Sequence, residues 1–323
     1  MKLWQDISGG KNVKLLYTLK NIFKYLIPDI CYRIRLGKIF HQFRQAADKD
    51  YILSRVDYYN KLFIPESLPE SSPSLSQHKL GKSKLNYFFD SYEYTRWFPK
   101  SLRWNYLFGD VINVPNIPSI VKSRPINGDN YNSVILNLDK VRHFVFLDDY
   151  IPFEKKLNKI IFRGDIAHKP HRIRFMEMYI NHPMCDLGEV NSQHNPQGEW
   201  HKKKISLLDH LDYKFILALE GNDVASNLKW VMSSNSIAVM PRPNYETWFM
   251  EGTLKPNFHY IEIKPDYSDL EERLDYYISH PEEAREIIGN AHDYVAQFQD
   301  KKRERMISLL VLRKYFQMTK QQM

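Results

Sequence analysis

The stretch that decides the fold of this chain is residues 213–263, which read YKFILALEGNDVASNLKWVMSSNSIAVMPRPNYETWFMEGTLKPNFHYIEI. Tyr213–Leu219 is a short apolar run typical of a buried strand, and Ile237–Met240 and His259–Ile263 are two further strand candidates. Between the first two, Val224–Met232 has the pattern of a helix. A strand, a polar turn, a helix and another strand form the βαβ unit of a parallel sheet, so the sequence predicts an α/β fold.

Polar side chains stand where these strands are expected to end, or in the turns that follow. Parallel sheets bind ligands at the carboxyl ends of their strands, and the backbone N–H groups of a helix start suit a phosphate. An ordinary capped turn with a solvated helix start would use the same residue types, since capping residues are common. The residues in question are Asn222, Asp223, Ser226, Asn227, Arg242 and Glu246.

A second strand, turn and helix pattern lies upstream of this stretch. Lys159–Phe162 is predicted as a strand and Pro170–Ile180 as a helix. Gly164, in the turn between them, permits a close backbone approach, and Arg163 and Arg172 offer forked donors to a diphosphate. A surface ion pair is the usual role of a lone arginine and is the alternative here.

The composition is that of an ordinary globular protein, with 43% apolar residues and a length that suits two domains or one large α/β domain. The two cysteines, Cys31 and Cys185, fit a reducing compartment. No run approaches the roughly 18 apolar residues of a transmembrane helix, and no signal-peptide pattern is visible, so we expect a cytoplasmic protein. Asp148 and Asp149 would be the start of an acidic metal site, but we expect no metal.

The positive charge of the chain is concentrated at its beginning. Residues 1–44 carry nine Lys and Arg against two Asp, a net charge of +7 out of +8 for the whole chain. Val13–Ile27 predicts an amphipathic helix, and a second basic stretch follows over Tyr32–Arg44. We interpret residues 1–44 as an anchor on an anionic membrane surface, where each basic residue contributes about 1 kcal/mol. Two helices packed on the domain are the alternative, and a nucleic-acid arm has little support without a recognised module.

The elements in the rest of the chain are predicted from turn-forming residues and short apolar runs. A loop rich in Pro, Ser and Lys spans residues 65–84, and helical character is sparse in the half that follows it. The short strands expected there are Asn86–Phe89, Asp110–Val114, Ser133–Leu138 and His143–Leu147. Helices are predicted over Tyr245–Met250, Leu270–Ile278, Glu282–Gln299 and Lys302–Met318.

Several blocks of sequence, spread along the chain, resemble the sequence motifs of one enzyme family. They are FPKSLRWNYLFGDVINVP (98–115), VKSRPI (121–126), NSVILNLDKVRHF (132–144), FRG (162–164), LEGNDVASNLKW (219–230), MPRPNYETWFMEG (240–252) and LKPNFHYIEIK (254–264). Over residues 85–290 the chain resembles glycosyltransferase family 90, which includes protein O-glucosyltransferases and fungal capsule xylosyltransferases. The motifs are most similar to those of the bacterial lipopolysaccharide-core branch of that family.

The resemblance implies a GT-B-like α/β fold, in which two Rossmann-like domains face a cleft. On this basis we expect the chain to divide into four consecutive segments. These are a basic helical leader over 1–64, an acceptor-side domain over 85–155, a nucleotide-sugar-binding domain over 156–299, and a C-terminal helix over 300–323 that packs back on the N-terminal domain.

The resemblance also implies a hexosyltransferase that moves a hexose from a UDP-sugar to a lipopolysaccharide (lipooligosaccharide) core acceptor, with inversion and without a metal or other cofactor. It would act on the cytoplasmic face of the bacterial inner membrane, to which residues 1–44 would attach it, and no nucleic-acid partner is expected. Protein cations would neutralise the leaving diphosphate. The candidates for the donor site are Arg163, Gly164, Arg172, Asn222, Asp223, Ser226, Asn227, Lys229, Arg242 and Glu246.

The general base is harder to assign, because the chain departs from the family pattern. Family members carry an aspartate shortly after the strand matched by Val111–Val114, where this chain has Asn116, and an amide cannot act as a base. Asp110 is the candidate in its place and Asp129 the alternative, although both also suit turns. A further departure is Asp165, an acid beside the expected diphosphate. The departure at Asn116 motivates the rival hypothesis of a non-catalytic protein that binds anionic glycolipid on a transferase fold.

Overall fold

The structure is a computed structural model that describes residues 8–191 and 198–322. Over these residues the chain forms two compact units, each assembled from separate parts of the sequence, whereas the sequence predicted consecutive segments. Unit 1 comprises the described residues of Met1–Asn12, Arg142–Pro243 and Thr253–Gln297. Unit 2 comprises those of Val13–Val141, Asn244–Gly252 and Phe298–Met323.

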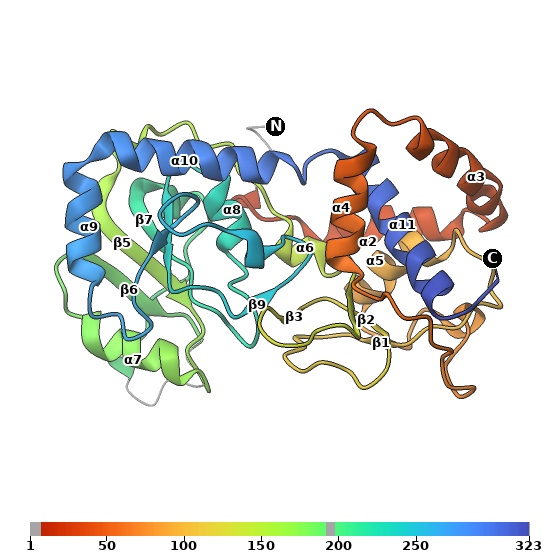
Figure 1. Cartoon of the computed structure of the whole chain (residues 1–323). Coiled ribbons are helices and arrows are strands. Elements are labelled where there is room, and N and C mark those ends of the chain that lie inside the picture. The colour runs from red at the N-terminus through yellow and green to blue at the C-terminus, as the bar shows by residue number, and fades with distance from the viewer. Residues whose placement is uncertain (1–7, 192–197, 323) are drawn as a thin grey trace. The chain divides into compact units, whose positions relative to one another are not determined.

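Unit 1 is built around one sheet of five parallel strands, which lie in the order β10–β8–β7–β5–β6 (Figure 1). The chain enters the sheet at β5, adds β6 on one side, and then adds β7, β8 and β10 on the other. The winding therefore reverses between β5 and β7, as in doubly wound α/β sheets. The predicted α/β fold with a parallel sheet is confirmed. The strands are β5 (Leu157–Gly164), β6 (Cys185–Glu189), β7 (Tyr213–Leu217), β8 (Ile237–Met240) and β10 (Ile261–Glu262).

The core of unit 1 follows from the alternation of side chains along the strands. Phe215 and Leu217 of β7 point to one face, where they share a buried apolar cluster with residues of three helices. Ile216, between them in sequence, points to the opposite face. Figure 1 shows α10 running along the top of this unit, with α9 joining it at the edge of the sheet. The helices are α7 (Pro170–Tyr179), α8 (Leu228–Met232), α9 (Leu270–Ser279) and α10 (Pro281–Ala296).

Unit 2 combines a small parallel sheet with several helices. Its strands lie in the order β1–β2–β4, and a separate antiparallel pair is formed by β3 and β9. The strands are β1 (Tyr106–Leu107), β2 (Ser119–Val121), β3 (Arg124–Pro125), β4 (Ser133–Ile135) and β9 (Tyr245–Glu246). The helices are α2 (Lys14–Leu26), α3 (Ile30–Arg44), α4 (Lys49–Tyr59), α5 (Leu85–Thr95) and α11 (Lys301–Met318), and the short α6 (Lys140–His143) spans the sequence boundary to unit 1.

The structure corrects the predictions for three short strands. Asn86–Phe89 lies inside α5, in which the consecutive residues 87–91 are all buried, so the helix is enclosed around a full turn instead of burying alternate residues. Residues 110–114 form no strand, because they lie between Gly109, which has a positive φ of 130°, and Pro115, which has no N–H to donate to a ladder. Residues 143–147 likewise continue from α6 without strand pairing.

Two predicted helices in the deciding stretch are also corrected. The helix expected over Val224–Met232 is confined to α8, because the residues before it fold as a turn that the Asn227 side chain ties to β7. The helix expected over Tyr245–Met250 instead begins with β9, which pairs with β3. By contrast, β8 has the predicted bounds and α7, α9, α10 and α11 differ from theirs by a few residues at most.

A buried ion pair joins helices α4 and α11 in the core of unit 2. Arg55 lies 2.5 Å from one carboxylate oxygen of Glu304 and 3.1 Å from the other, and both side chains are buried. Trp248 donates its indole N–H to the same carboxylate, and the guanidinium of Arg55 donates to the hydroxyl of Tyr59. Tyr59 and Trp248 in turn stack with ring centroids 3.8 Å apart. The Glu304 carboxylate therefore balances a charge that has no access to water.

We expect Glu304→Ala to destabilise the protein severely. Removing one partner leaves the other charge buried and uncompensated, which costs roughly 3–5 kcal/mol. The measurement is the free energy of unfolding in urea, with Lys301→Ala as the control, because Lys301 begins the same helix and is exposed. Similar small losses in the two variants would contradict a structural role for this pair.

Candidate functional site

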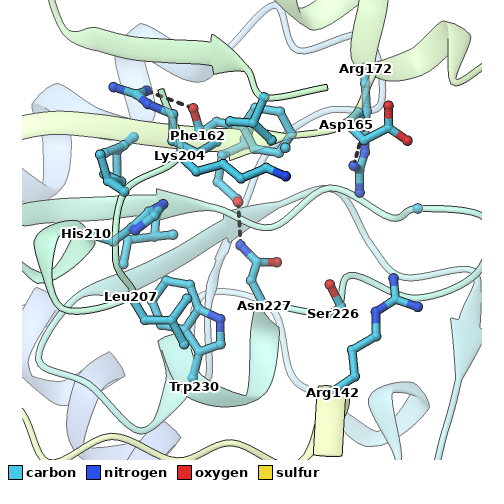
Figure 2. Close-up of a pocket in the computed structure, with 18 of the residues that line it drawn as sticks. Arg142, Phe162, Asp165, Arg172, Lys204, Leu207, His210, Ser226, Asn227 and Trp230 are labelled. Carbon is cyan, nitrogen blue, oxygen red and sulfur yellow. Dashed lines mark hydrogen bonds between the residues drawn. The ribbon is translucent and has the colours of Figure 1, made fainter. Parts of the chain in front are cut away.

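A pocket of about 370 Å³ lies in unit 1 at the carboxyl ends of β5 and β7, the two strands between which the winding reverses. This is the place where doubly wound sheets bind ligands, because the loops after the two strands diverge there. Figure 2 shows the pocket with His210, Leu207 and Trp230 on one side and Asp165, Arg172 and Arg142 on the other. Lys204 extends between these groups.

The structure brings together seven of the ten predicted donor-site residues around this pocket. The seven come from the end of β5, from α7 and from the segment between β7 and α8, so the fold assembles them from parts of the chain that are 50 residues or more apart in sequence. They are Arg163, Gly164, Arg172, Asn222, Asp223, Ser226 and Asn227.

Arg163 lies at the end of β5, and its guanidinium is directed to the neighbouring strand. It donates to the backbone oxygens of Phe162 and Asp186 and, at 2.8 Å, to the carboxylate of Asp186. Lys202 and Tyr213 donate to the same carboxylate, and although burial opposes ionisation, these three donors hold the pKa of Asp186 well below its usual range. The charge of Arg163 is therefore balanced within the protein, and Arg163 supports the pocket wall.

Arg172 ties together the loops on both sides of the pocket. From α7 its guanidinium donates to the backbone oxygens of Asp165, Leu219 and Glu220 at 2.6 to 2.8 Å. Burial lowers the pKa of Arg172 to about 10, although nearby Asp165 opposes this, so the side chain is still charged at neutral pH. Carbonyl oxygens carry no net charge, so these hydrogen bonds fix the guanidinium without neutralising it.

Asp165, the acid that departs from the family pattern, is bound by groups of its own loop. Its carboxylate accepts hydrogen bonds from the N–H of Ala167 and from the Lys169 ammonium, at 3.1 and 2.8 Å. Burial alone would raise the pKa of Asp165, but these donors bring it below its usual value. Glu189 of β6, fully buried, fixes the same loop by accepting from the N–H of Ile166. The loop after β5 is thus held by carboxylates that point into it.

The turn before α8 forms the floor of the pocket. Asn227 donates from its side-chain amide to the carbonyl of Leu217 at the end of β7, at 2.9 Å (Figure 2). Asp223 is buried, whereas Asn222 is exposed and Ser226 is partly exposed. This arrangement presents the amide oxygen of Asn227 and the hydroxyl of Ser226 as polar groups for a ligand.

Four of the other lining residues carry polar groups that the sequence analysis did not single out. Lys11, Arg142 and Lys204 are exposed cations that reach the pocket from distant parts of the sequence. His210 is buried, and burial lowers its pKa, so its ring is neutral at pH 7. Its Nδ1 lies 2.8 Å from the carbonyl of Ser206 and therefore carries the proton, which leaves Nε2 as an acceptor.

The pocket carries an excess of positive charge. Six of its lining residues are Lys or Arg and two are Asp, and at least one of each sign is already paired within the protein. Guanidinium and ammonium groups that converge on a small pocket suit the oxygens of a phosphate or diphosphate. Leu207 and Trp230, on the opposite side, offer an apolar wall to a planar ring.

Three of the predicted donor-site residues lie outside the residues that line this pocket. Lys229 is fully buried in α8. The Arg242 side chain is 71% exposed beyond the end of β8, where it donates to Glu262 at 3.0 Å. Glu246 belongs to unit 2, where it forms a buried cross-strand ion pair with Arg124 at 2.7 Å. Prolines on both sides of Arg242 and the strand position of Glu246 account for these placements, and a donor contact by these residues stays a prediction.

Both candidates for the general base lie in unit 2. Asp110 accepts a hydrogen bond from Lys122, whose side chain is buried. Asp129 is exposed and caps the backbone N–H of Tyr131 two residues on, at 2.9 Å, which is the Asx turn that its sequence context also suited. Asp110, at 21% exposure of its side chain, is the candidate with the more defined environment.

Within the described residues, no three His, Cys, Asp or Glu side chains gather as a metal-binding group would. Asp149, part of the acidic pair considered for a metal, is buried and bound to the Lys156 ammonium at 2.8 Å. It also accepts from the backbone N–H of Asn235. Its role in the structure is therefore to anchor a loop of unit 1.

The comparisons with known proteins agree on one family. The sequence model of the family described as Glycosyl transferase family 90 matches residues 138–322. The O-glucosyltransferase LpsA of Dichelobacter nodosus is 43% identical to this chain over 311 residues, which are 96% of the chain and 97% of that protein. The chain belongs to glycosyltransferase family 90. The family resemblance inferred from the sequence is confirmed, and this family 90 protein is a glycosyltransferase.

Eukaryotic relatives of the family 90 protein match a shorter part of it. Protein O-glucosyltransferase 2 of Danio rerio is 28% identical over 144 residues, which are 42% of the chain and 28% of that protein. Protein O-glucosyltransferase 1 of Rattus norvegicus is 25% identical over 150 residues, which are 45% of the chain and 38% of that protein.

We expect Gly164→Ala to distort the pocket of this glycosyltransferase. A Cβ atom at Gly164 would collide with the ring of Phe162, which is buried and lies under the guanidinium of Arg172. Overpacking of this kind costs about 1–3 kcal/mol. The check is thermal unfolding, with Gly221→Ala as the matched control in the same pocket, since a Cβ there would meet nothing closer than 3.6 Å. Equal stability of the two variants would show that Phe162 is free to move.

Proposed function

We propose that the pocket in unit 1 binds the nucleoside diphosphate part of a UDP-hexose, and that the protein transfers the hexose to a lipopolysaccharide core acceptor. The observation that supports this most is the cluster of cations at the point where the sheet winding reverses. The relatives are named as O-glucosyltransferases, so glucose is the first hexose to test. The acceptor class rests on the resemblance of the sequence blocks to the lipopolysaccharide-core branch.

The chemistry of the transfer explains why such a pocket would carry positive charge. The acceptor oxygen bonds to the anomeric carbon while the bond from that carbon to the diphosphate breaks, and negative charge develops on the leaving group. Arg142, Lys204 and the fixed guanidinium of Arg172 would stabilise that charge. We propose inversion at the sugar carbon without a metal or other cofactor, in keeping with the family that the sequence resembles.

The acceptor and the base belong in this proposal to unit 2. A GT-B-like arrangement, as the resemblance implies, would use unit 1 for the donor and unit 2 for the acceptor. Asp110 would accept the proton of the attacking hydroxyl, with Lys122 orienting its carboxylate. Asp129 is the weaker candidate, because one of its carboxylate oxygens already caps a turn. The rival hypothesis, a non-catalytic glycolipid-binding protein, is not favoured, because the chain is 43% identical over nearly its full length to a protein named as an O-glucosyltransferase.

We also propose that residues 1–44 hold the protein at an anionic membrane surface, on the cytoplasmic face of the bacterial inner membrane where the acceptor would be met. The described helices include none that is long and apolar enough to cross a membrane. The net charge of +7 on residues 1–44 supports an electrostatic attachment.

We expect Lys204→Ala to weaken UDP binding about tenfold or more, the loss that follows when a charge-assisted hydrogen bond is removed. Isothermal titration calorimetry with UDP, and with GDP, CMP and ADP as competitors for specificity, measures this. Lys203→Ala is the matched control, because Lys203 is exposed, carries the same charge and does not line the pocket. Arg242→Ala tests the wider predicted site, and unchanged affinity would confine the donor to the pocket. Equal affinity in Lys204→Ala, Lys203→Ala and the unaltered protein would sink the pocket assignment.

We expect Asp110→Asn to lower kcat about a hundredfold or more while UDP affinity is unchanged, since general-base removal typically has that effect. Transfer of labelled glucose from UDP-glucose to purified core oligosaccharide measures kcat. Asp129→Asn is the comparison, with a smaller expected loss. A normal kcat for Asp110→Asn would exclude this base, and binding of UDP without any transfer or donor hydrolysis in the unaltered protein would support the glycolipid-binding alternative.

A further inference from the structure

Helix α2 is attached to unit 2 by its polar side. The hydroxyl of Tyr17 donates to Asp90 at 2.6 Å, and the ammonium of Lys24 donates to Glu93 at 2.8 Å, both acids lying on α5. Asn21, one turn from each, is buried. These three residues fall on one arc of the helix, because they are three or four positions apart. The face that touches the protein is therefore the hydrophilic one.

The apolar side of α2 consequently points away from unit 2. Phe23 and Leu26 are each 70% exposed and Leu15 is 66% exposed, whereas apolar residues of a surface helix ordinarily face the core. Helix α2 does pack on the rest of unit 2, as the alternative of two packed helices expected, but it does so through its polar side. The exposed apolar residues of α2 and its ends are Val13, Leu15, Leu16, Leu19, Ile22, Phe23, Leu26 and Ile27, and α3 adds Ile30 and Ile34.

Buried polar contacts hold this reversed orientation in place. Arg96 donates to the carbonyls of Lys24 and Ile27 at the end of α2, and to the Asp29 carboxylate in the corner between α2 and α3. Tyr92 also donates to Asp29, at 2.8 Å. Turning α2 over would leave these groups without partners inside the protein, at a cost of about 1–3 kcal/mol for each buried polar group.

A pocket of about 230 Å³ lies beside α2, among α3, α5 and α11. Among its lining residues, Arg35 and Arg305 are exposed arginines with no hydrogen-bond or ion-pair partner in the described part of the chain. Tyr25, Tyr32 and Trp97 form aromatic walls. Two unpaired guanidiniums at the edge of such a pocket suit a phosphate group, to which arginine donates two hydrogen bonds at once.

We propose that α2 lies flat in the interface of an anionic bilayer with its outward apolar face among the acyl chains, and that the pocket beside it receives the phosphate of one lipid headgroup. The proposal deepens the membrane attachment under the proposed function and rests on it. Charge complementarity identifies the occupant. Residues 13–44 hold seven Lys and Arg and one Asp, a net +6 that matches a leaflet of anionic lipid, whereas a second copy of this chain would present the same positive charge and be repelled.

The insertion of α2 is tested by co-sedimentation with vesicles of phosphatidylcholine alone and of an equimolar mixture with phosphatidylglycerol. Phe23→Glu is expected to weaken binding to the mixed vesicles about tenfold or more, because it removes a phenylalanine ring that would be buried among the acyl chains and adds a negative charge. Phe63→Glu is the matched control, since Phe63 is 73% exposed in the same unit and lies outside the basic stretch of residues 1–44. Leu26→Glu repeats the test at a second exposed position.

Three outcomes overturn the insertion. One is an equal loss of vesicle binding in Phe23→Glu and Phe63→Glu, and another is no loss in either. The third is concentration-dependent self-association in sedimentation velocity that Phe23→Glu abolishes, without vesicle binding by the unaltered protein, which would assign the face to a second copy. UDP titration of the same preparations separates this result from the donor proposal, because Phe23 belongs to unit 2 and does not line the unit 1 pocket.

The headgroup pocket is tested with dihexanoyl phosphatidylglycerol below its micelle concentration, a soluble lipid that needs no bilayer. Arg35→Gln and Arg305→Gln are each expected to weaken its binding about fivefold, and Phe23→Glu is expected to leave it unchanged. Lys38→Gln is the control, because it lies on the same helix as Arg35 and does not line the pocket. Equal losses in Arg35→Gln and Lys38→Gln, or displacement of the lipid by inorganic phosphate at equal concentration, would overturn the assignment to a lipid headgroup.

Discussion

The reversal of winding between β5 and β7 is the constraint on which the rest of unit 1 depends. Two parallel strands that lie side by side send their loops to opposite faces of the sheet, and a gap remains between the loops. Arg172 spans that gap by hydrogen bonds to the backbone after each strand. Because its partners are uncharged carbonyls, the side chain that joins the two loops also places a fixed positive charge at the side of the pocket. The same hydrogen bonds of Arg172 therefore hold the two loops together and fix the position of the charge.

Local sequence patterns predicted what depends on local structure. Strands β7 and β8 are short apolar runs that end at polar residues, and a similar run with a glycine marks the end of β5. The sequence therefore predicted these strands and the position of Gly164. The sequence predicted helix for the turn before α8, because its pattern continues into α8. Only the hydrogen bond from the Asn227 side chain to the end of β7 fixes it as a turn. Lys11 carried no signal at all, since the fold alone brings it to the pocket.

Pairing between charges explains the other differences. Arg163 and Glu246 have the residue types that bind a nucleotide sugar, yet each has a carboxylate or guanidinium partner on the adjacent strand, Asp186 and Arg124 respectively. Sequence shows a charge but not its counter-charge when the two lie in different segments. Amphipathic periodicity has the same limit: it identified the α2 helix, but not that the polar face would be the buried one, because that depends on Asp90 and Glu93 of α5.

Hydrogen–deuterium exchange of the full chain with and without UDP tests the central claim most directly, because it locates the nucleotide without any substitution. We expect slower exchange in the loop after β5, in the first turns of α7 and in residues 217–230, all of which surround the unit 1 pocket. Protection confined to unit 2, or to the end of β8 around Arg242, would contradict a donor site at the reversal of the sheet.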